Sequence, residues 1–334
     1  MTQDSPLTQE ELQLAIFILG PWLIGCFIDV LLQGILFCQF SHYFGRYPDD
    51  GIGNRLAVTG LLILTTLKSV HSFASSWVLF IIHFKDLTGA IALNYTAWWL
   101  TSSGLMVASI GIYVQAFFCH RLWVISWKNY WVLAPIIVVL LFAYVSICLA
   151  TYYISQGAQA GPHIATWFAA HLSSVFAGDL LITLSTAYFL LRSRKDLLPQ
   201  TVGLINALIR LTFQTAAPAA MCAMFNLIFS QIYSGDNKLI SSAFNQTLPK
   251  LYAFSMMWTL NARDQLRSYT VERFYDTSGV GARPTRENVE LGKLGGVHVH
   301  KHVESRSVEI RKLFRHSTTG TETKNATEEY KIDA

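Results

Sequence analysis

Seven long apolar stretches fill the first four-fifths of this 334-residue chain. A bilayer core is about 30 Å thick and a helix rises about 1.5 Å per residue, so about 20 apolar residues cross it. The stretches are Ile16–Phe40, Leu56–Phe80, Ala97–Cys119, Trp131–Ile154, Ile164–Leu191, Val202–Tyr233 and Ile240–Leu260. Lipid cannot satisfy open backbone groups, so each should be helical. The sequence predicts an all-α, polytopic bundle of seven transmembrane helices over residues 16–262.

The charged residues are few and unevenly placed. They make up 14% of the chain, and 24 of these 46 residues lie in 263–334. Soluble domains carry about 25% charged residues. The chain before residue 263 therefore lacks the polar surface of a soluble enzyme, a coiled coil or a nucleic-acid-binding protein. The last apolar stretch holds Asn245, Gln246 and Lys250, so a six-helix bundle stays open as an alternative.

Basic residues in the connections predict the orientation, because they concentrate on the cytoplasmic side. Seven lie on one side of the bundle: Arg46, Arg55, Arg121, Lys128, Arg192, Arg194 and Lys195. The opposite connections hold two, Lys85 and Lys238. We therefore predict an external N-terminal segment (1–15) and a cytoplasmic tail (263–334), with Arg121, Arg210 and Arg263 as cytoplasmic-face anchors. The plasma membrane is favoured over internal membranes, and no cleaved signal peptide is expected.

The tail mixes Gly, Ser, Thr and both charges without a long apolar run, which predicts disorder. On the predicted external side, Asn94 and Asn245 begin glycosylation sequons. All five cysteines lie within apolar stretches, so no external disulfide is expected, and Cys119 is a candidate for palmitoylation. Thr8 and Glu11 have the spacing of a capping box at the start of the first helix.

Several ionisable residues lie inside the predicted spans, where charge is expensive. Asp29, Lys68 and Asp179 are near the middle of the first, second and fifth spans, Lys250 is in the seventh, and His71 is one turn from Lys68. Asp29 has two cationic candidates for a partner, Lys68 and Lys250. One interpretation is a pairing that fixes the helix register. The other is a polar chamber that binds a ligand or passes ions or protons.

Enzymatic and cofactor-dependent classes receive little support. Gln246 stands four residues before Lys250, where a retinal protein would need an acid, and an intramembrane zinc hydrolase needs several histidines at helical spacing. His71 and His171 lie on different predicted helices. His298, His300 and His302 alternate in the tail but are too few fixed ligands for a metal. We expect no catalytic residues, no metal and no cofactor, with an intramembrane hydrolase as the least favoured exception.

Ordered motifs along the chain point to a family. They include Ala116-Phe117-Phe118-Cys119-His120-Arg121-Leu122-Trp123, Gly178-Asp179, Ile209-Arg210-Leu211-Thr212 and Leu248-Pro249-Lys250-Leu251-Tyr252. Over about residues 15–267 the sequence resembles the multi-span membrane proteins abundant in mushroom-forming fungi that are catalogued as domain of unknown function 6534. The resemblance implies an integral membrane protein of fungal type. It implies no activity, because the family has none assigned.

The function expected from this architecture is that of a receptor-like seven-helix sensor. A small ligand of unknown identity would bind in the outer half of the bundle, and the cytoplasmic connections and tail would meet a signalling partner. The alternative class is a channel or secondary transporter that uses Asp29, Lys68 and Asp179. A third is a membrane scaffold or assembly protein. The expected partners are the lipid bilayer, the ligand and that signalling partner, and no nucleic acid.

Overall fold

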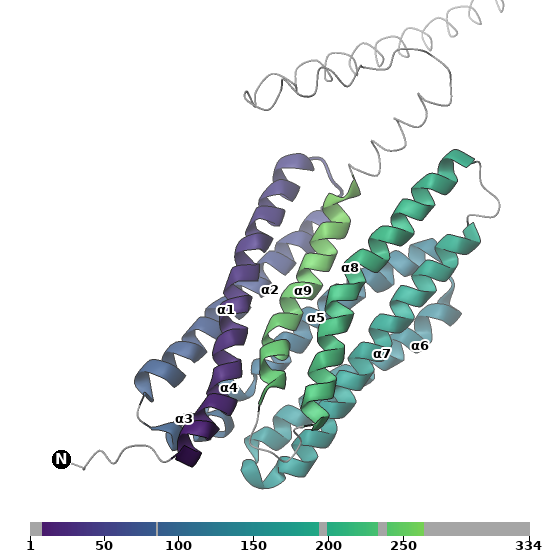
Figure 1. The fold of residues 1–334 in the computed structure, drawn as a ribbon. Coiled ribbons are helices and arrows are strands. Elements are labelled where there is room, and N and C mark those ends of the chain that lie inside the picture. Colours follow the sequence, from purple (N-terminus) through teal and green to yellow (C-terminus); the bar gives the residue numbers. More distant parts are fainter. Residues whose placement is uncertain (1–8, 85, 194–198, 233–238, 264–334) are drawn as a thin grey trace, which may run out of the picture. The chain divides into compact units, whose positions relative to one another are not determined.

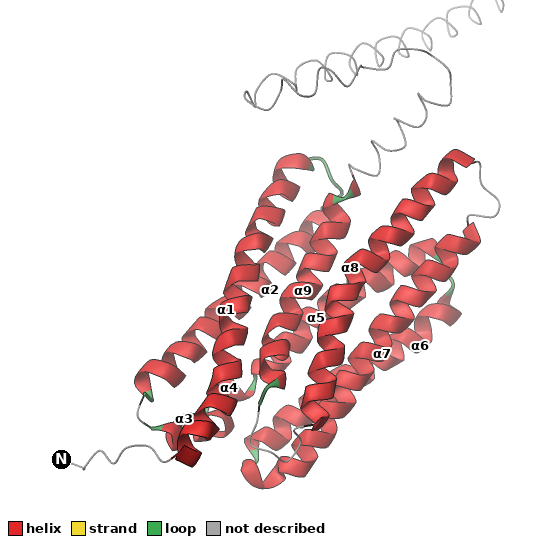
Figure 2. Cartoon of the chain, viewed as in Figure 1, coloured by secondary structure: helices red, strands yellow, loops and turns green. Residues whose placement is uncertain are grey.

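In the computed structural model, residues 9–84, 86–193, 199–232 and 239–263 are described, and their regular structure is helical (Figure 2). The order of elements along the chain is shown in Figure 1. The elements are α1 Gln9–Arg46, α2 Ile52–Trp77, the π-helical turn η1 Val78–Ile82, α3 Leu87–Thr96, α4 Trp98–Thr101, α5 Ser103–Ile125, α6 Tyr130–Ser155, the 3-10 turn η2 Ala158–Ala160, α7 Gly161–Ser193, α8 Pro199–Ile232 and α9 Ser241–Asn261.

Six helical segments in the described part of the chain are long and apolar enough to cross a membrane. They run over Ile16–Arg46, Ile52–Ile82, Trp98–Ile125, Tyr130–Ser155, Gly161–Ser193 and Ile205–Ile232. The first six predicted spans are therefore found, and most extend a few residues further, because the helices continue into polar flanks. The seventh predicted span, α9, does not reach the same apolarity.

The third predicted span differs from the structure at its start. The chain forms the separate helix α3 before it, capped by Asp86, whose side chain accepts a hydrogen bond from Gly89 N at 2.8 Å. Ala97 then adopts an extended conformation, with φ −85° and ψ 109°. This residue separates α3 from α4 and coincides with the predicted start of the third span. Within that span, Ser102 (φ −82°, ψ 1°) separates α4 from α5, where the sequence predicted a continuous helix. Apolarity alone gave no sign of the break.

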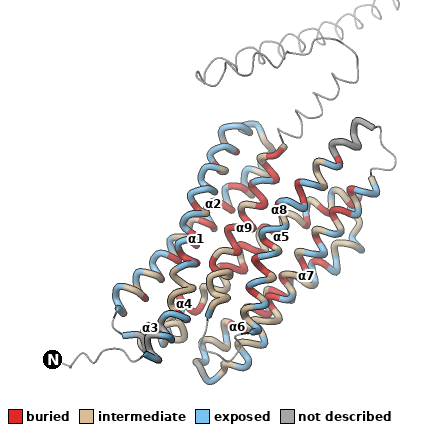
Figure 3. The backbone as a smooth tube through the Cα atoms, in the orientation of Figure 1, coloured by how far each residue is buried: buried red, intermediate tan, exposed pale blue. Residues whose placement is uncertain are grey.

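α9 is the most enclosed helix, although its sequence is the least apolar. It packs against α1, α2, α5 and α8, and Figure 1 shows it between α1 and α8. Buried positions are frequent along its whole length (Figure 3). Because its neighbours and not lipid surround α9, its polar side chains can be satisfied by protein groups.

Apolar side chains cover the outside of the bundle as well as its core. Leu36, Ile110 and Met256 belong to the main buried cluster. Phe27, Val70 and Trp131 are exposed at 68%, 62% and 90%. A soluble protein rarely exposes apolar side chains on this scale, and a lipid-facing surface requires them.

Two glycines allow close helix contacts. A Cβ on Gly25 of α1 would lie 2.9 Å from Gln246 Cβ and 3.1 Å from Ala243 Cα of α9, and one on Gly178 of α7 would lie 2.7 Å from Leu140 Cδ2 of α6. Gly20 and Gly34, also in α1, have nothing within 4 Å of the position that a Cβ would take.

Some expectations lie outside the described residues. They are the capping box, because its Thr8 precedes the described residues, the disorder of the tail beyond Arg263, and the tail histidines at 298, 300 and 302.

Candidate functional site

Asp29, Lys68 and Lys250 meet where α1, α2 and α9 pack together. Lys68 Nζ lies 3.1 Å from Asp29 Oδ1, and Lys250 Nζ lies 3.8 Å from the same oxygen. All three side chains are at most 1% exposed. The pairing considered from the sequence, one aspartate between two lysines, is therefore present.

Polar neighbours complete the coordination of both ammonium groups. Lys250 Nζ donates to Gln33 Oε1 at 2.6 Å, to Thr65 O at 2.6 Å and to Ser69 Oγ at 2.8 Å. Ser69 in turn donates to Asp29 Oδ2 at 2.8 Å. We call Asp29, Lys68 and Lys250 with these partners the Asp29 cluster.

Lys68 Nζ contacts Ser72 Oγ at 2.7 Å and Gln246 Oε1 at 2.5 Å. Every charged group of the Asp29 cluster thus has protein partners. The Asp29 cluster therefore links α1, α2 and α9 through buried side-chain contacts.

The two intramembrane histidines do not join the Asp29 cluster. His71 Nε2 lies 2.9 Å from Trp99 O, and its ring contacts the Trp99 ring edge-on. His171 Nδ1 lies 2.9 Å from Ala143 O. Each ring therefore links two helical segments through a backbone carbonyl.

Asp179 forms a second polar group on the opposite side of α9. Its Oδ1 accepts from Gln115 Nε2 of α5 at 2.8 Å, and its Oδ2 accepts from Tyr252 Oη of α9. Asp179 itself is on α7, so this group joins three helices. It is separate from the Asp29 cluster, to which Lys250, two residues before Tyr252, belongs.

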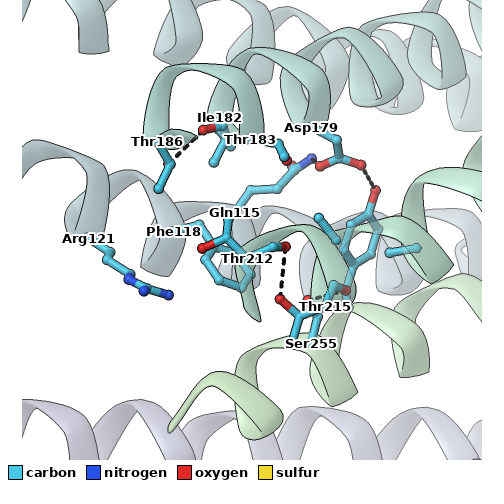
Figure 4. A pocket seen from close by; sticks show the side chains of 13 residues that line it. Gln115, Phe118, Arg121, Asp179, Ile182, Thr183, Thr186, Thr212, Thr215 and Ser255 are labelled. Carbon is cyan, nitrogen blue, oxygen red and sulfur yellow. Dashed lines mark hydrogen bonds between the residues drawn. The ribbon is translucent and has the colours of Figure 1, made fainter. Parts of the chain in front are cut away.

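A pocket opens beside Asp179 between α5, α7, α8 and α9 (Figure 4). We call it the Asp179 pocket. Its lining comprises Gln115, Phe118, Arg121, Asp179, Ile182, Thr183, Thr186, Thr212, Thr215, Ala216, Ala219, Tyr252 and Ser255. The positions open to the centre of a water molecule fill about 40 Å³. Polar groups on largely apolar walls are typical of small-ligand sites.

Arg121 lines this pocket from the C-terminal part of α5. Among the described residues no carboxylate pairs with it, and Figure 4 shows its guanidinium directed towards the pocket. The sequence predicted a cytoplasmic-face anchor, and Arg121 is near the expected end of its helix. Its side chain nevertheless lines the Asp179 pocket.

The other two predicted anchors differ from Arg121. Arg210 of α8 is exposed, as an anchor reaching the headgroups would be. Arg263 Nη2 lies 2.6 Å from Asp50 Oδ2, and its guanidinium stacks 4.7 Å from the centre of the Tyr47 ring. The hydrogen bond from Arg263 holds the pKa of Asp50 well below its usual range. This contact ties the end of α9 to the connection between α1 and α2.

The two sequons lie in helices and not in open loops. Asn94 belongs to α3 and donates to Ala90 O at 3.3 Å. Asn245 belongs to α9, and its Oδ1 accepts from Asn226 Nδ2 at 3.4 Å. The fold gives neither asparagine the exposed loop that glycosylation needs. The five cysteines are free, and Cys119 is buried, which hides its sulfur from acylation.

Together, the apolar helices and the polar groups enclosed between them are consistent with an integral membrane protein and indicate a multi-pass one. Among the described residues, no group of three His, Cys, Asp or Glu side chains is placed to hold a metal ion.

The comparisons with known proteins agree with the resemblance seen in the sequence. The model of a family of unknown function (DUF6534) matches residues 175–265. This segment contains Asp179, Thr212, Lys250 and Tyr252, while Arg121 lies before it. No curated protein and no solved structure shows a significant match to the chain.

The sequence identified Asp179 and Arg121 as noteworthy residues but did not bring them together. It missed Gln115, Tyr252 and the hydroxyl-bearing residues of the pocket. Gln115 gave one signal, because an amide in the middle of an apolar span needs a partner. Nothing in the sequence told which helix would supply that partner.

Proposed function

We propose that this chain is a receptor-like membrane protein that binds a small ligand in the Asp179 pocket. The observation that carries the proposal is the Arg121 guanidinium, which has no carboxylate partner among the described residues and lines the same pocket as Asp179. An ionisable group inside a membrane bundle is energetically costly, and such groups commonly mark functional sites. Ligand sites of helical bundles are built from side chains on facing helices, which is how this pocket is made.

The proposal includes a topology of seven transmembrane helices, with α9 as the seventh. α9 has 21 residues and is therefore about 30 Å long, enough to cross a bilayer core. Its low apolarity is no obstacle, because α1, α2, α5 and α8 surround it. With seven crossings and the observed distribution of basic residues, the N-terminus is outside and the tail is cytoplasmic.

The ligand site is in the cytoplasmic half of the bundle under this orientation. Arg121 is near the C-terminal end of α5, and Thr212 is in the N-terminal half of α8. From the sequence we expected a ligand in the outer half. That placement depended on architecture alone, and the pocket favours the opposite half.

The transport alternative needs a wet pathway through Asp29, Lys68 and Asp179. Lys68 and Asp29 are at most 1% exposed and are satisfied by protein groups. They lie on the other side of α9 from Asp179. This separation favours a binding site over a continuous pathway.

The experiment compares two neighbouring alanines of α8. Ala216 lines the pocket, whereas Ala217 is exposed. We expect Ala216→Phe to fill the pocket and to remove a small molecule that native mass spectrometry detects on the full-length protein purified from membranes. Ala217→Phe, the matched control, should leave that molecule bound. Equal retention by both variants, or no bound molecule on the wild-type protein, contradicts the proposal.

Reconstitution in liposomes separates the alternatives. Reception predicts no proton or ion flux through the wild-type protein. Flux that Asp179→Asn abolishes would establish transport instead. A protein with neither flux nor a bound small molecule would be a scaffold.

A further inference from the structure

Four Ser and Thr hydroxyl groups in the Asp179 pocket donate their protons to backbone carbonyls. Thr186 donates to Ile182 O at 2.7 Å, Thr212 to Leu208 O at 2.8 Å, and Thr215 to Leu211 O at 2.9 Å. Ser255 donates to Thr215 O at 3.0 Å. Hydroxyls bonded to backbone carbonyls in this way keep only their lone pairs for a ligand. The interior of the pocket is therefore rich in acceptors.

Asp179 adds negative charge to that interior. Each of its two oxygens accepts one hydrogen bond, from Gln115 and from Tyr252. Both donors stabilise the ionised carboxylate. A carboxylate offers about four lone-pair positions, so two remain for a group that donates.

Arg121 supplies the positive charge at the other end of the pocket. Gln115 and Arg121 are six residues apart on α5, which corresponds to about 9 Å along the helix axis. No ion pair within 4.0 Å joins Arg121 to Asp179. Figure 4 shows them on opposite sides of the pocket, with Thr183, Thr186 and Thr212 between them.

The walls between the two charges limit the size of a ligand. Phe118, Ile182, Ala216 and Ala219 contribute apolar surface. The volume of about 40 Å³ open to water centres corresponds to about three water molecules. The pocket therefore favours a compact molecule, whose short carbon chain would contact the apolar walls with its methylene groups.

We propose that the Asp179 pocket binds a small zwitterion, in which a short carbon chain separates an ammonium from a carboxylate. The ammonium faces Asp179 and the hydroxyl oxygens, and the carboxylate faces Arg121. Each ligand charge then meets a charge of opposite sign, and each ammonium proton meets an acceptor. The inference rests on the proposed function and specifies its ligand.

The first test uses the wild-type, full-length protein in nanodiscs of phosphatidylcholine. The probe is 4-aminobutanoate, compared with butanoate, butylamine and sodium chloride by the shift in melting temperature and by calorimetric titration. We expect 4-aminobutanoate to bind about tenfold more tightly than either singly charged analogue, because each lacks one charge-assisted contact. Equal binding of butylamine, or an equal shift with sodium chloride, overturns the inference in favour of a simple cation site.

Chain length gives a second measurement that needs no variant. Glycine, 3-aminopropanoate, 4-aminobutanoate and 6-aminohexanoate carry the same charges at increasing separation. The fixed positions of Asp179 and Arg121 predict one preferred length among them. Equal affinity along the series would show that the ligand's ammonium and carboxylate do not contact Asp179 and Arg121 at the same time. This result would overturn the inference.

Arg121→Gln tests the carboxylate end, with Arg210→Gln as its matched control. Both remove one arginine, but Arg210 is exposed and outside the pocket. We expect Arg121→Gln to abolish the advantage of 4-aminobutanoate over butylamine, and Arg210→Gln to retain it. A folded Arg121→Gln variant that keeps this advantage contradicts the inference.

The outcomes also separate this inference from the proposed function. If Ala216→Phe displaces a native small molecule but no zwitterion of the series binds, the ligand class is wrong and the binding function stands. If Ala216→Phe and Ala217→Phe behave alike and no zwitterion binds, both proposals fail.

Discussion

Lys250 illustrates how one residue of low hydropathy can be stable inside a membrane bundle. Its ammonium donates to Gln33, Thr65 and Ser69, three acceptors that use all of its protons. The Ser69 hydroxyl in turn donates a hydrogen bond to Asp29. The cation is thus connected to its counter-ion both directly and through a hydroxyl.

Replacing Lys250 with methionine should therefore destabilise the protein. The change removes the donor to Gln33, Thr65 and Ser69 at a site that is 0% exposed, and breaking a buried pair costs about 3 kcal/mol. We expect the melting temperature in detergent to fall by roughly 5 to 10 °C. Lys128→Met, at an exposed position, is the control and should change it little. A Lys250→Met variant with the melting temperature of the wild-type protein would show that the Asp29 cluster does not stabilise the packing of its helices.

The contact between Asp50 and Arg263 predicts a dependence on pH. The hydrogen bond from Arg263 lowers the pKa of Asp50, and bonds from Tyr43 and Asn54 act in the same direction. The native state binds fewer protons than the unfolded state, so the contact stabilises the protein above the unfolded pKa of about 4. That stabilisation is lost as the pH falls through the lowered pKa of the folded state.

Melting curves of the wild-type protein and of Arg263→Gln between pH 3 and 7 check this prediction. The wild-type protein should melt higher by a constant margin above about pH 5, and the margin should shrink below about pH 4. A margin that is independent of pH would show that Asp50 does not titrate with the contact. Arg210→Gln serves as the control for the loss of one positive charge.

At the scale of the element, α9 departs most from what its sequence indicates. Its composition made it the least certain span, yet it packs against four other helices. The side facing α1 and α2 carries Gln246 and Lys250, and the side facing α5, α7 and α8 carries Tyr252 and Ser255. Polar side chains on two sides of α9 therefore reflect its burial among other helices and not its exposure to water.

The close approach of α1 and α9 gives a prediction for Gly25. A methyl group there meets Ala243 Cα at 3.1 Å and Gln246 Cβ at 2.9 Å, so Gly25→Ala should force the helices apart and cost roughly 2 kcal/mol. Gly34→Ala, on the same helix with open space around it, should be neutral or slightly stabilising. Thermal melting of the two variants in the same detergent distinguishes them. Equal melting temperatures would contradict this packing.

The sequence predicted the fold better than the site, for a physical reason. Span positions follow from local apolarity, which each segment carries by itself. The pairing of Asp29 with Lys68 and Lys250 was also accessible, because sequential packing makes their helices neighbours. The Asp179 pocket depends on which faces of α5, α7, α8 and α9 turn towards each other, and no single segment encodes that. The break at Ser102 was missed because it lies inside a stretch that is apolar as a whole.

At the scale of the whole molecule, the exposed apolar surface predicts behaviour during extraction. Full-length protein should remain in the pellet when membranes are washed with alkaline carbonate and should enter solution only with detergent, because its outer side chains need an apolar environment. Immunoblotting of both fractions checks this. Recovery in the carbonate supernatant would contradict integration in the bilayer.

The orientation is tested by a tag at each terminus. Basic connections on the cytoplasmic side predict that protease added to intact cells removes a tag before residue 1 and spares one after residue 334. A cytosolic marker must survive the same treatment as a control for lysis. The reverse pattern would invert the topology, and protection of both tags, or removal of both, would point to an even number of crossings.

The polarity of α9 has a consequence for biogenesis. Of the described helices it is the last to leave the ribosome, and a segment with a lysine and several amides partitions poorly into lipid by itself. Until it arrives, Asp29 lacks its contact with Lys250, and Lys68 lacks its contact with Gln246. Docking of this helix against partners already inserted completes the structure, so a chain truncated before residue 241 is a natural substrate for membrane quality control.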